Sequence, residues 1–217
     1  MKYGELPKDL GIYDTKCSEM MFYQYFPIKL ANDGTHTDYG VKYENRLNIF
    51  GELIYDSSKD FMQYFGCDLF DNSYIYLTVK HLHQSPNCTF NRKGYHSDGF
   101  LTDDINYIWY DKHPTIFNTT EFNLTLDDKI SIVEMEQQAK VENEVTFKEN
   151  TLLRLNQYNI HKVAPITDNG MRTFVKISFS KDRYDLIGNS HNYLLDYNWE
   201  MKERKEHRNI PQTIITK

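Results

Sequence analysis

The sequence has no long apolar run and no leader of the kind that exported proteins carry. Nowhere in its 217 residues do about 18 apolar residues follow one another, as a membrane-spanning helix requires. The first residues, MKYGELPKDLGIYD, contain no apolar core of signal-peptide length. We therefore expect a protein that does not span a membrane, and we predict a cytoplasmic location.

Cysteine is also scarce. Cys17, Cys67 and Cys88 are an odd number and lack C-x-x-C spacing. This pattern argues against a disulfide framework and against a zinc knuckle. A reducing compartment fits it best.

The chain has no excess of positive charge. Its formal net charge is −6 at pH 7. This charge disfavours nucleic acid as a partner, because a surface that binds nucleic acid has to neutralise many phosphates. Hydrophobic residues make up 40% of the chain, and its 17 Tyr and 13 Phe far exceed the aromatic content of disordered chains. We expect a globular protein, and the length with no visible internal boundary predicts one domain over residues 1–217.

The first part of the chain reads as helical and the second as mostly strands. Between about residues 39 and 65, apolar residues recur at helical spacing, which predicts one or two amphipathic helices. From residue 73 onward, short β-branched and aromatic runs alternate with Asn, Asp, Gly and Pro. The predicted strands are Tyr74–Leu82, Ile105–Tyr110, Glu144–Phe147, Thr151–Leu155 and Thr173–Phe179.

These patterns divide the chain into three regions. We predict helical or irregular support over residues 1–72, a β core over 73–182 and a C-terminal segment over 183–217. Residues 126–141 combine helix formers with acidic residues and fit either a helix or a crossing loop. The charge-rich stretch after Trp199 is most simply a solvated helix followed by a loose end.

A His-x-Asp pair at His96 and Asp98 is the first candidate for metal chemistry. In a strand, side chains two residues apart share a face, so the two could bind neighbouring positions on one ion. Two imidazoles and one carboxylate on one side of an octahedron leave positions open for a cosubstrate and dioxygen, as in non-haem Fe(II) enzymes. In a chain with 8 histidines, an isolated triplet of this kind is close to chance expectation and would otherwise be a polar turn.

The support comes from residues 158–172, YNIHKVAPITDNGMR, which supply His161 and Arg172. The segment ITDNG at Ile166–Gly170 has good turn chemistry, and a hairpin there would bring Arg172 beside His161. A guanidinium can bind a carboxylate through two parallel hydrogen bonds. Taken alone, His161 would more often be a core or rim histidine. The alternative for Arg172 is a strand-end arginine bonded to a surface acid.

In the order and spacing of His96, Asp98, His161 and Arg172, the chain resembles the Fe(II)/2-oxoglutarate-dependent oxygenase superfamily. The resemblance covers about residues 74–180. The resemblance implies a double-stranded β-helix of the jelly-roll or cupin type, with His96, Asp98 and His161 as ligands of catalytic Fe(II). It implies that Arg172 binds the far carboxylate of the cosubstrate 2-oxoglutarate. It further implies oxidation of a substrate by dioxygen, with release of succinate and carbon dioxide.

In that family, polar side chains on neighbouring strands assist cosubstrate binding. The candidates here are Tyr76, Thr78 and Lys80 on one predicted strand and Asn106 on another. Alternation places Tyr76 and Thr78 on one face of their strand, with Ile75 and Leu77 on the other, and only one of these faces can look inward.

Two other interpretations stay open. One is a cupin-like metalloenzyme that does not use 2-oxoglutarate, in which Arg172 would bind a substrate carboxylate. The other is a non-catalytic jelly-roll binding protein. As substrate, a small molecule and a protein side chain fit the aromatic-rich composition equally well, and the composition leaves the oligomeric state open.

Overall fold

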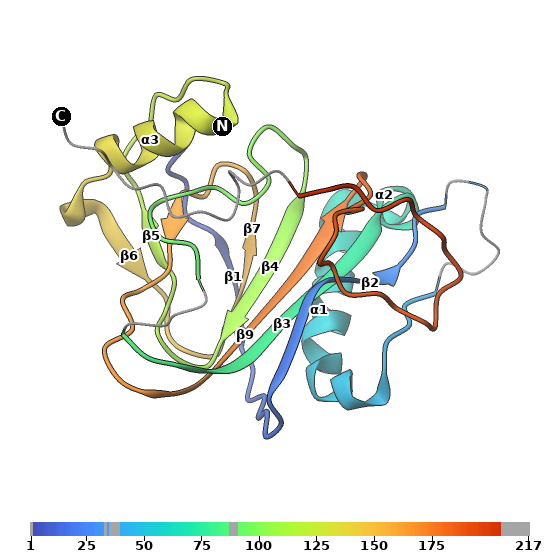
Figure 1. Cartoon of the computed structure of the whole chain (residues 1–217). Coiled ribbons are helices and arrows are strands. Elements are labelled where there is room, and N and C mark those ends of the chain that lie inside the picture. The colour runs from blue at the N-terminus through green and yellow to red at the C-terminus, as the bar shows by residue number, and fades with distance from the viewer. Residues whose placement is uncertain (1, 33, 35–39, 87–90, 205–217) are drawn as a thin grey trace.

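The structure, a computed structural model, describes residues 2–32, 34, 40–86 and 91–204. Its regular structure is mainly β, in a six-stranded and a three-stranded sheet with few helices (Figure 1). All strand pairs are antiparallel. The prediction of a mainly β chain with N-terminal helices is confirmed at this level. Within the described ranges, no helix is long and apolar enough to cross a membrane.

The large sheet has the strand order β1-β7-β4-β9-β3-β2. Its longest strands are the neighbours β3 and β9, which pair over their whole length, from Tyr74 opposite Ser180 to Gln84 opposite Gly170. Both are rich in β-branched and aromatic residues, which suit a buried pleated surface. The strands are β1 (Lys8–Ile12), β2 (Met21–Lys29), β3 (Tyr74–Gln84), β4 (Ile105–Tyr110), β7 (Thr151–Leu155) and β9 (Gly170–Ser180).

The small sheet has the order β6-β5-β8. Beyond β8, His96 forms an isolated antiparallel bridge with His161, so the chain before Asp98 extends this sheet by one more partner. The strands are β6 (Glu144–Thr146), β5 (Ile116–Asn118) and β8 (His161–Lys162).

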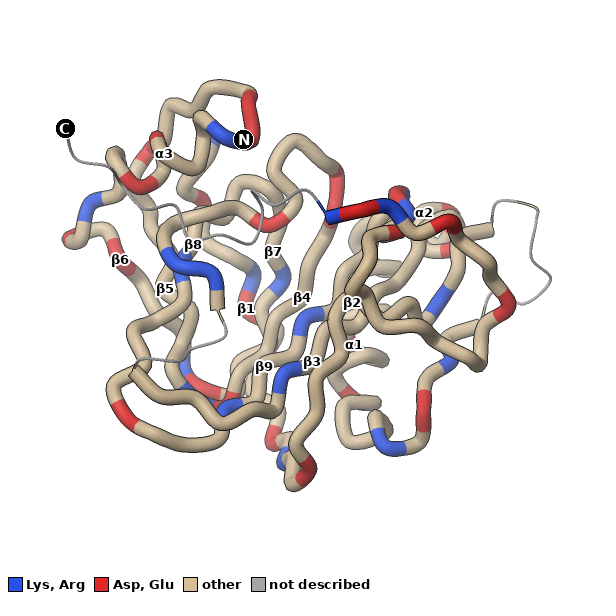
Figure 2. The backbone as a smooth tube through the Cα atoms, viewed as in Figure 1, with Lys and Arg blue, Asp and Glu red and all other residues tan. Residues whose placement is uncertain are grey.

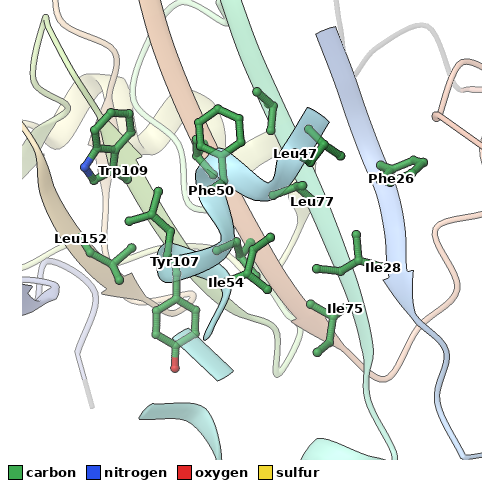
Figure 3. Close-up of a cluster of buried hydrophobic side chains, with 14 of the residues drawn as sticks. Phe26, Ile28, Leu47, Phe50, Ile54, Ile75, Leu77, Tyr107, Trp109 and Leu152 are labelled. Carbon is green, nitrogen blue, oxygen red and sulfur yellow. The ribbon is translucent and has the colours of Figure 1, made fainter. Parts of the chain in front are cut away.

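The N-terminal helices cover one face of the large sheet. They are η1 (Asn45–Phe50), α1 (Gly51–Phe65) and the short α2 (Cys67–Asp71), and they confirm the helical spacing over residues 39–65. Leu53, Ile54 and Phe61 of α1 are buried at helical spacing. They pack with side chains of the sheet in the main hydrophobic core (Figure 3), where each fully buried side chain of this size contributes about 1.5–3 kcal/mol.

The segment that the sequence left open between helix and loop is a helix. It is α3 (Asp128–Gln138), and it is followed by η2 (Val141–Asn143). Asp127 caps α3, since its side chain accepts hydrogen bonds from the amides of Lys129 and Ile130.

Strand alternation decides which side chains face the helices. Ile75, Leu77 and Val79 of β3 belong to the core beneath α1 and η1. Tyr76 and Thr78, between them, therefore point to the opposite face, together with their register partners on β9. That face is covered at one end by the small sheet and at the other by the C-terminal segment, drawn red in Figure 1.

The prediction for residues 1–72 was incomplete, because β1 and β2 join the large sheet. The pairing of β2 with β3 shifts register between Tyr23 and Phe26 and again between Pro27 and Lys29, so the alternation that marks a strand is interrupted. The helix predicted after Trp199 is absent as far as the described residues reach, to 204, and residues 205–217 lie outside them.

Candidate metal centre

Backbone pairing brings the two histidines of the centre together. The amides of His96 and His161 each donate to the carbonyl oxygen of the other at 2.9 Å, so the residues lie directly opposite one another. Side chains of opposite residues project from the same face, and the two ring centroids are 4.5 Å apart. One ligand is thus held by β8 and the other by the bridge to it.

Asp98 comes from a turn. The prediction that His96 and Asp98 share a strand face was wrong, because only His96 forms a bridge and residues 98–101 turn. Gly99 has a φ of +72°, and a Cβ there would lie 2.8 Å from Thr102 Oγ1. The Thr102 amide closes the turn by donating to the Gly99 carbonyl oxygen at 2.9 Å. A glycine after Asp98 therefore allows the carboxylate to approach the imidazoles.

Each imidazole is held through its Nδ1 atom. His161 Nδ1 lies 2.9 Å from the carbonyl oxygen of Asn159, and His96 Nδ1 lies 3.1 Å from that of Gly94. A carbonyl oxygen only accepts hydrogen bonds, so both contacts assign the proton to Nδ1. The Nε2 lone pair of each ring is left for a metal ion, in the arrangement that orients histidine ligands in metalloproteins.

The three side chains lie close enough to fit one ion. One ligand atom from each of His96, Asp98 and His161 lies within 4.8 Å of the others. His161 Nε2 is 3.9 Å from Asp98 Oδ2. Ligands that share an ion at about 2.1 Å lie about 3 to 4 Å apart, so small side-chain movements complete the site. The triad that the sequence predicts is therefore assembled in space, and it could bind a metal ion.

The charge states of the triad also suit a metal ligand set. Burial, reinforced by His161, lowers the pKa of His96 to about 3, and burial lowers the pKa of His161. Burial by itself would raise the pKa of Asp98, but Lys176 and His161 lower it overall. Near neutral pH the site therefore offers two neutral imidazoles and one carboxylate without losing a proton first.

Lys176, which the sequence patterns did not single out, contacts the triad. Its Nζ lies 3.3 Å from Asp98 Oδ2, and the attraction of Asp98 raises the pKa of Lys176 despite its burial. The available signal was a lysine between the apolar residues Val175 and Ile177 of a strand, on the same face as Phe174.

Arg172 occupies a different place from the one predicted. The expected hairpin beside His161 does not form, since β8 pairs with β5 while β9 pairs with β3 and β4. Arg172 is buried, and its Nε and Nη2 donate to the carbonyl oxygens of Lys112 and His113 at 2.8 and 3.2 Å. Among the residues that the structure describes, its Nη1 has no hydrogen-bond partner. A buried guanidinium nitrogen is thus left for an anion.

Arg172, Lys176 and Lys80 form what we call the inner cation cluster. Lys176 lies opposite Thr78 and Arg172 opposite Leu82, so both are diagonal neighbours of Lys80 on the face away from α1. Figure 2 shows basic residues in the central part of this sheet. Burial, together with Lys176 and Arg172, lowers the pKa of Lys80 to about 8. Three cations gathered in this way favour an anionic ligand.

The other predicted cosubstrate residues lie on the same face with their polar groups engaged. The Tyr76 hydroxyl donates to the Asp182 carbonyl oxygen at 3.0 Å. Thr78 Oγ1 accepts from the Tyr25 amide at 3.0 Å, and Asn106 Oδ1 accepts from the Ser178 hydroxyl at 2.6 Å. Tyr76 thus anchors the C-terminal segment, while Thr78 lies beside Lys176.

Comparisons with known proteins give little beyond this geometry. No known family matches the sequence, and no curated protein matches it. Among solved structures, the chain is similar to a bsmA homolog from Methylobium petroleophilum, with a TM-score of 0.38 and 11% identity over 72% of this chain. The match spans 63% of that protein's chain.

Proposed function

We propose that this protein is a non-haem Fe(II)- and 2-oxoglutarate-dependent oxygenase with a double-stranded β-helix core of the jelly-roll or cupin type. The observation that carries the proposal is the convergence of His96, Asp98 and His161 with both Nε2 atoms available. Two antiparallel sheets that meet near this triad support the fold assignment. The proposed substrate is a small molecule or a protein side chain.

The three side chains would hold Fe(II) on one side and leave the remaining positions to the cosubstrate and dioxygen. When bound, the iron supplies the chemistry that couples oxidation of the substrate to the conversion of 2-oxoglutarate and dioxygen into succinate and carbon dioxide. For a hydroxylation, one oxygen atom of dioxygen enters the substrate and the other enters succinate. The carbonyls of Gly94 and Asn159 keep the imidazoles oriented.

The inner cation cluster supports a dicarboxylate as cosubstrate. Arg172 Nη1 can donate to the far carboxylate, and Lys80 adds a second positive charge on the same face. A ligand with two negative charges would offset the repulsion between these buried cations. The assignment of 2-oxoglutarate rests on this cluster, whereas the assignment of the metal rests on the triad.

Anaerobic titration tests the assignment of the metal and the assignment of 2-oxoglutarate separately. Fe(II) and then 2-oxoglutarate are added, and the visible absorption band expected when a keto acid chelates Fe(II) is recorded. We expect the band in the wild-type protein and in His83→Ala, whose exposed side chain lies outside the site. In Arg172→Ala we expect unchanged metal binding and about 100-fold weaker binding of 2-oxoglutarate, as for loss of a buried charge-assisted contact.

Each failure has its own meaning. Metal binding without the band would contradict 2-oxoglutarate and favour a cupin-like metalloenzyme of another kind. A band that never leads to succinate under air, with any member of a substrate panel, would favour a binding protein.

A further inference from the structure

A cleft lined by aromatic rings is linked to the candidate metal centre through Tyr25, because the Lys176 ammonium that contacts Asp98 also lies over the Tyr25 ring. The cleft has a volume of about 230 Å³ and is bounded by β2 and by the C-terminal segment. Among the residues that the structure describes, those that line the cleft include no Lys, Arg, Asp or Glu. The rings that line it belong to Tyr25, Tyr184, His191, Tyr197 and Trp199.

The rings are fixed by packing and by hydrogen bonds. Tyr184 stacks on Tyr76 of β3, with ring centroids 4.1 Å apart and planes at 11°. The ring centroid of Tyr197 lies 4.5 Å from that of Trp199 and 4.6 Å from that of His191. Preorganised rings of this kind lose little entropy when a ligand binds.

The loop that carries His191 is tied to the sheet. Ser190 and Gln24 exchange hydrogen bonds, in which the Ser190 amide donates to the Gln24 carbonyl oxygen and the Gln24 amide donates to Ser190 Oγ. The buried side-chain amide of Asn192 donates to the carbonyl oxygens of Pro27 and Lys42, at 2.8 Å each. The outer wall of the cleft is therefore a built surface.

Tyr25 connects the cleft with the centre. The ring centroids of Tyr25 and Tyr184 are 5.1 Å apart. The Lys176 Nζ atom lies 5.1 Å from the centroid of the Tyr25 ring. Lys176 in turn contacts Asp98 at 3.3 Å. Tyr25 adopts a left-handed φ of 46° at the register shift of β2, a conformation that costs a non-glycine residue about 1–2 kcal/mol. Such strain persists where the surroundings hold it, commonly at functional sites.

The cleft's own chemistry selects its ligand. Trp199 Nε1–H has no hydrogen-bond partner within the described part of the chain, so it can donate to a ligand. A cationic ligand is disfavoured, because no carboxylate of the described residues lines the cleft and the Lys176 ammonium lies over the Tyr25 ring. The volume falls between a cavity of about 150 Å³ that accommodates benzene and the roughly 300 Å³ or more of drug-sized sites. These features fit one or two rings.

We propose that this cleft binds the primary substrate through an uncharged planar ring that carries a hydrogen-bond acceptor. Ring stacking would supply the affinity and the Trp199 indole the orientation. The name "substrate" rests on the proposed oxygenase function. Binding of the ring itself requires neither iron nor 2-oxoglutarate.

The test is ligand-observed NMR with acetophenone, which is planar and uncharged and has an acceptor oxygen. Cyclohexyl methyl ketone, which lacks the planar ring, and phenyltrimethylammonium, which is cationic, serve as matched probes. We expect saturable binding of acetophenone and at least fivefold weaker binding of the other two. Trp199→Ala and Tyr197→Ala should each weaken acetophenone binding about 5- to 10-fold, from loss of one ring contact. Tyr55→Ala, an exposed ring on α1, is the control and should bind normally.

Equal binding of all three probes, or unchanged acetophenone binding in both cleft variants, would overturn the proposal. The same titration in Asp98→Ala separates it from the oxygenase assignment, because the cleft should bind the ring without the metal site. Normal ring binding in a protein that never consumes 2-oxoglutarate would contradict the assigned substrate role. If the protein consumes 2-oxoglutarate equally well with substrates that contain a planar ring and with substrates that lack one, the proposed ring binding in the cleft would be contradicted.

Discussion

The two faces of the large sheet have opposite chemistry. Toward α1, alternate residues of β3 and β9 are apolar and pack without charged groups, as Leu77, Ile177 and Phe179 do. Toward the small sheet, the same two strands carry Lys80 and Lys176 in a buried or half-buried setting. Burial of apolar side chains stabilises a fold, whereas burial of like charges opposes it. The face toward α1 therefore stabilises the fold, whereas the lysines on the other face destabilise it and suit an anionic ligand.

The largest expected effect on stability comes from the helix-covered face. Phe61 is buried and stacks on Phe179 at 4.2 Å, so Phe61→Ala should lower the free energy of unfolding by about 3–5 kcal/mol. Urea unfolding measures this change. Tyr55→Ala, at an exposed position of the same helix, should change it by less than about 0.5 kcal/mol. The folded fraction of Phe61→Ala should bind metal normally, and weakened metal binding would show that the two faces are coupled.

A smaller effect is expected at Lys176, on the other face. Its ammonium and a metal ion compete for Asp98, so Lys176→Met should bind Fe(II) or Co(II) about tenfold more tightly, as expected when a like charge is removed. Binding of 2-oxoglutarate should weaken in the same variant, because the inner cation cluster loses one charge. Lys181→Met, which removes an exposed lysine paired with Asp103, is the control. Weaker metal binding in Lys176→Met would show instead that Lys176 positions Asp98.

The smallest expected effect is a pH dependence from Lys80. Its pKa, lowered to about 8, means that the free protein loses this charge as the pH rises through 8. A dicarboxylate favours the charged form, so binding should take up a proton near pH 8.5, and affinity should fall a few-fold above that pH. The neighbouring groups titrate elsewhere, since the pKa of Lys176 is raised, that of Arg172 is about 10 and that of Asp98 is lowered.

Calorimetry in two buffers of different ionisation enthalpy measures this proton uptake. Lys80→Met should abolish it, while His83→Gln, a change of an exposed neighbour, should leave it intact. Uptake that persists in Lys80→Met would assign the proton to another group.

The sequence predicts the strands of the large sheet only in part. Segments with regular alternation were located well, as Ile105–Tyr110 and Thr151–Leu155 coincide with β4 and β7. β2 was missed because its bulge at Tyr25 and its Pro27 interrupt the period of two. Local pattern therefore sufficed where strands are regular and failed where they bend.

The site shows the same limit. His96, Asp98 and His161 were predicted from residue type and order, and the structure brings them together. The placement of Arg172 and the contact of Lys176 depend on which strands pair, and the pairing of β8 with β5 is a long-range choice that spacing does not encode. The three candidate ligands thus follow from the sequence, whereas the cation beside them follows only from the fold.

The most direct test of the central claim is anaerobic titration of the 217-residue chain with Fe(II), or with Co(II) as a spectroscopic substitute. We predict one ion per chain in the wild-type protein and in His83→Ala. His96→Ala, Asp98→Ala and His161→Ala should each weaken binding at least about 100-fold while their urea unfolding curves stay cooperative. Binding of one ion with unchanged affinity in all three variants, or no binding by the wild-type protein, would contradict the account.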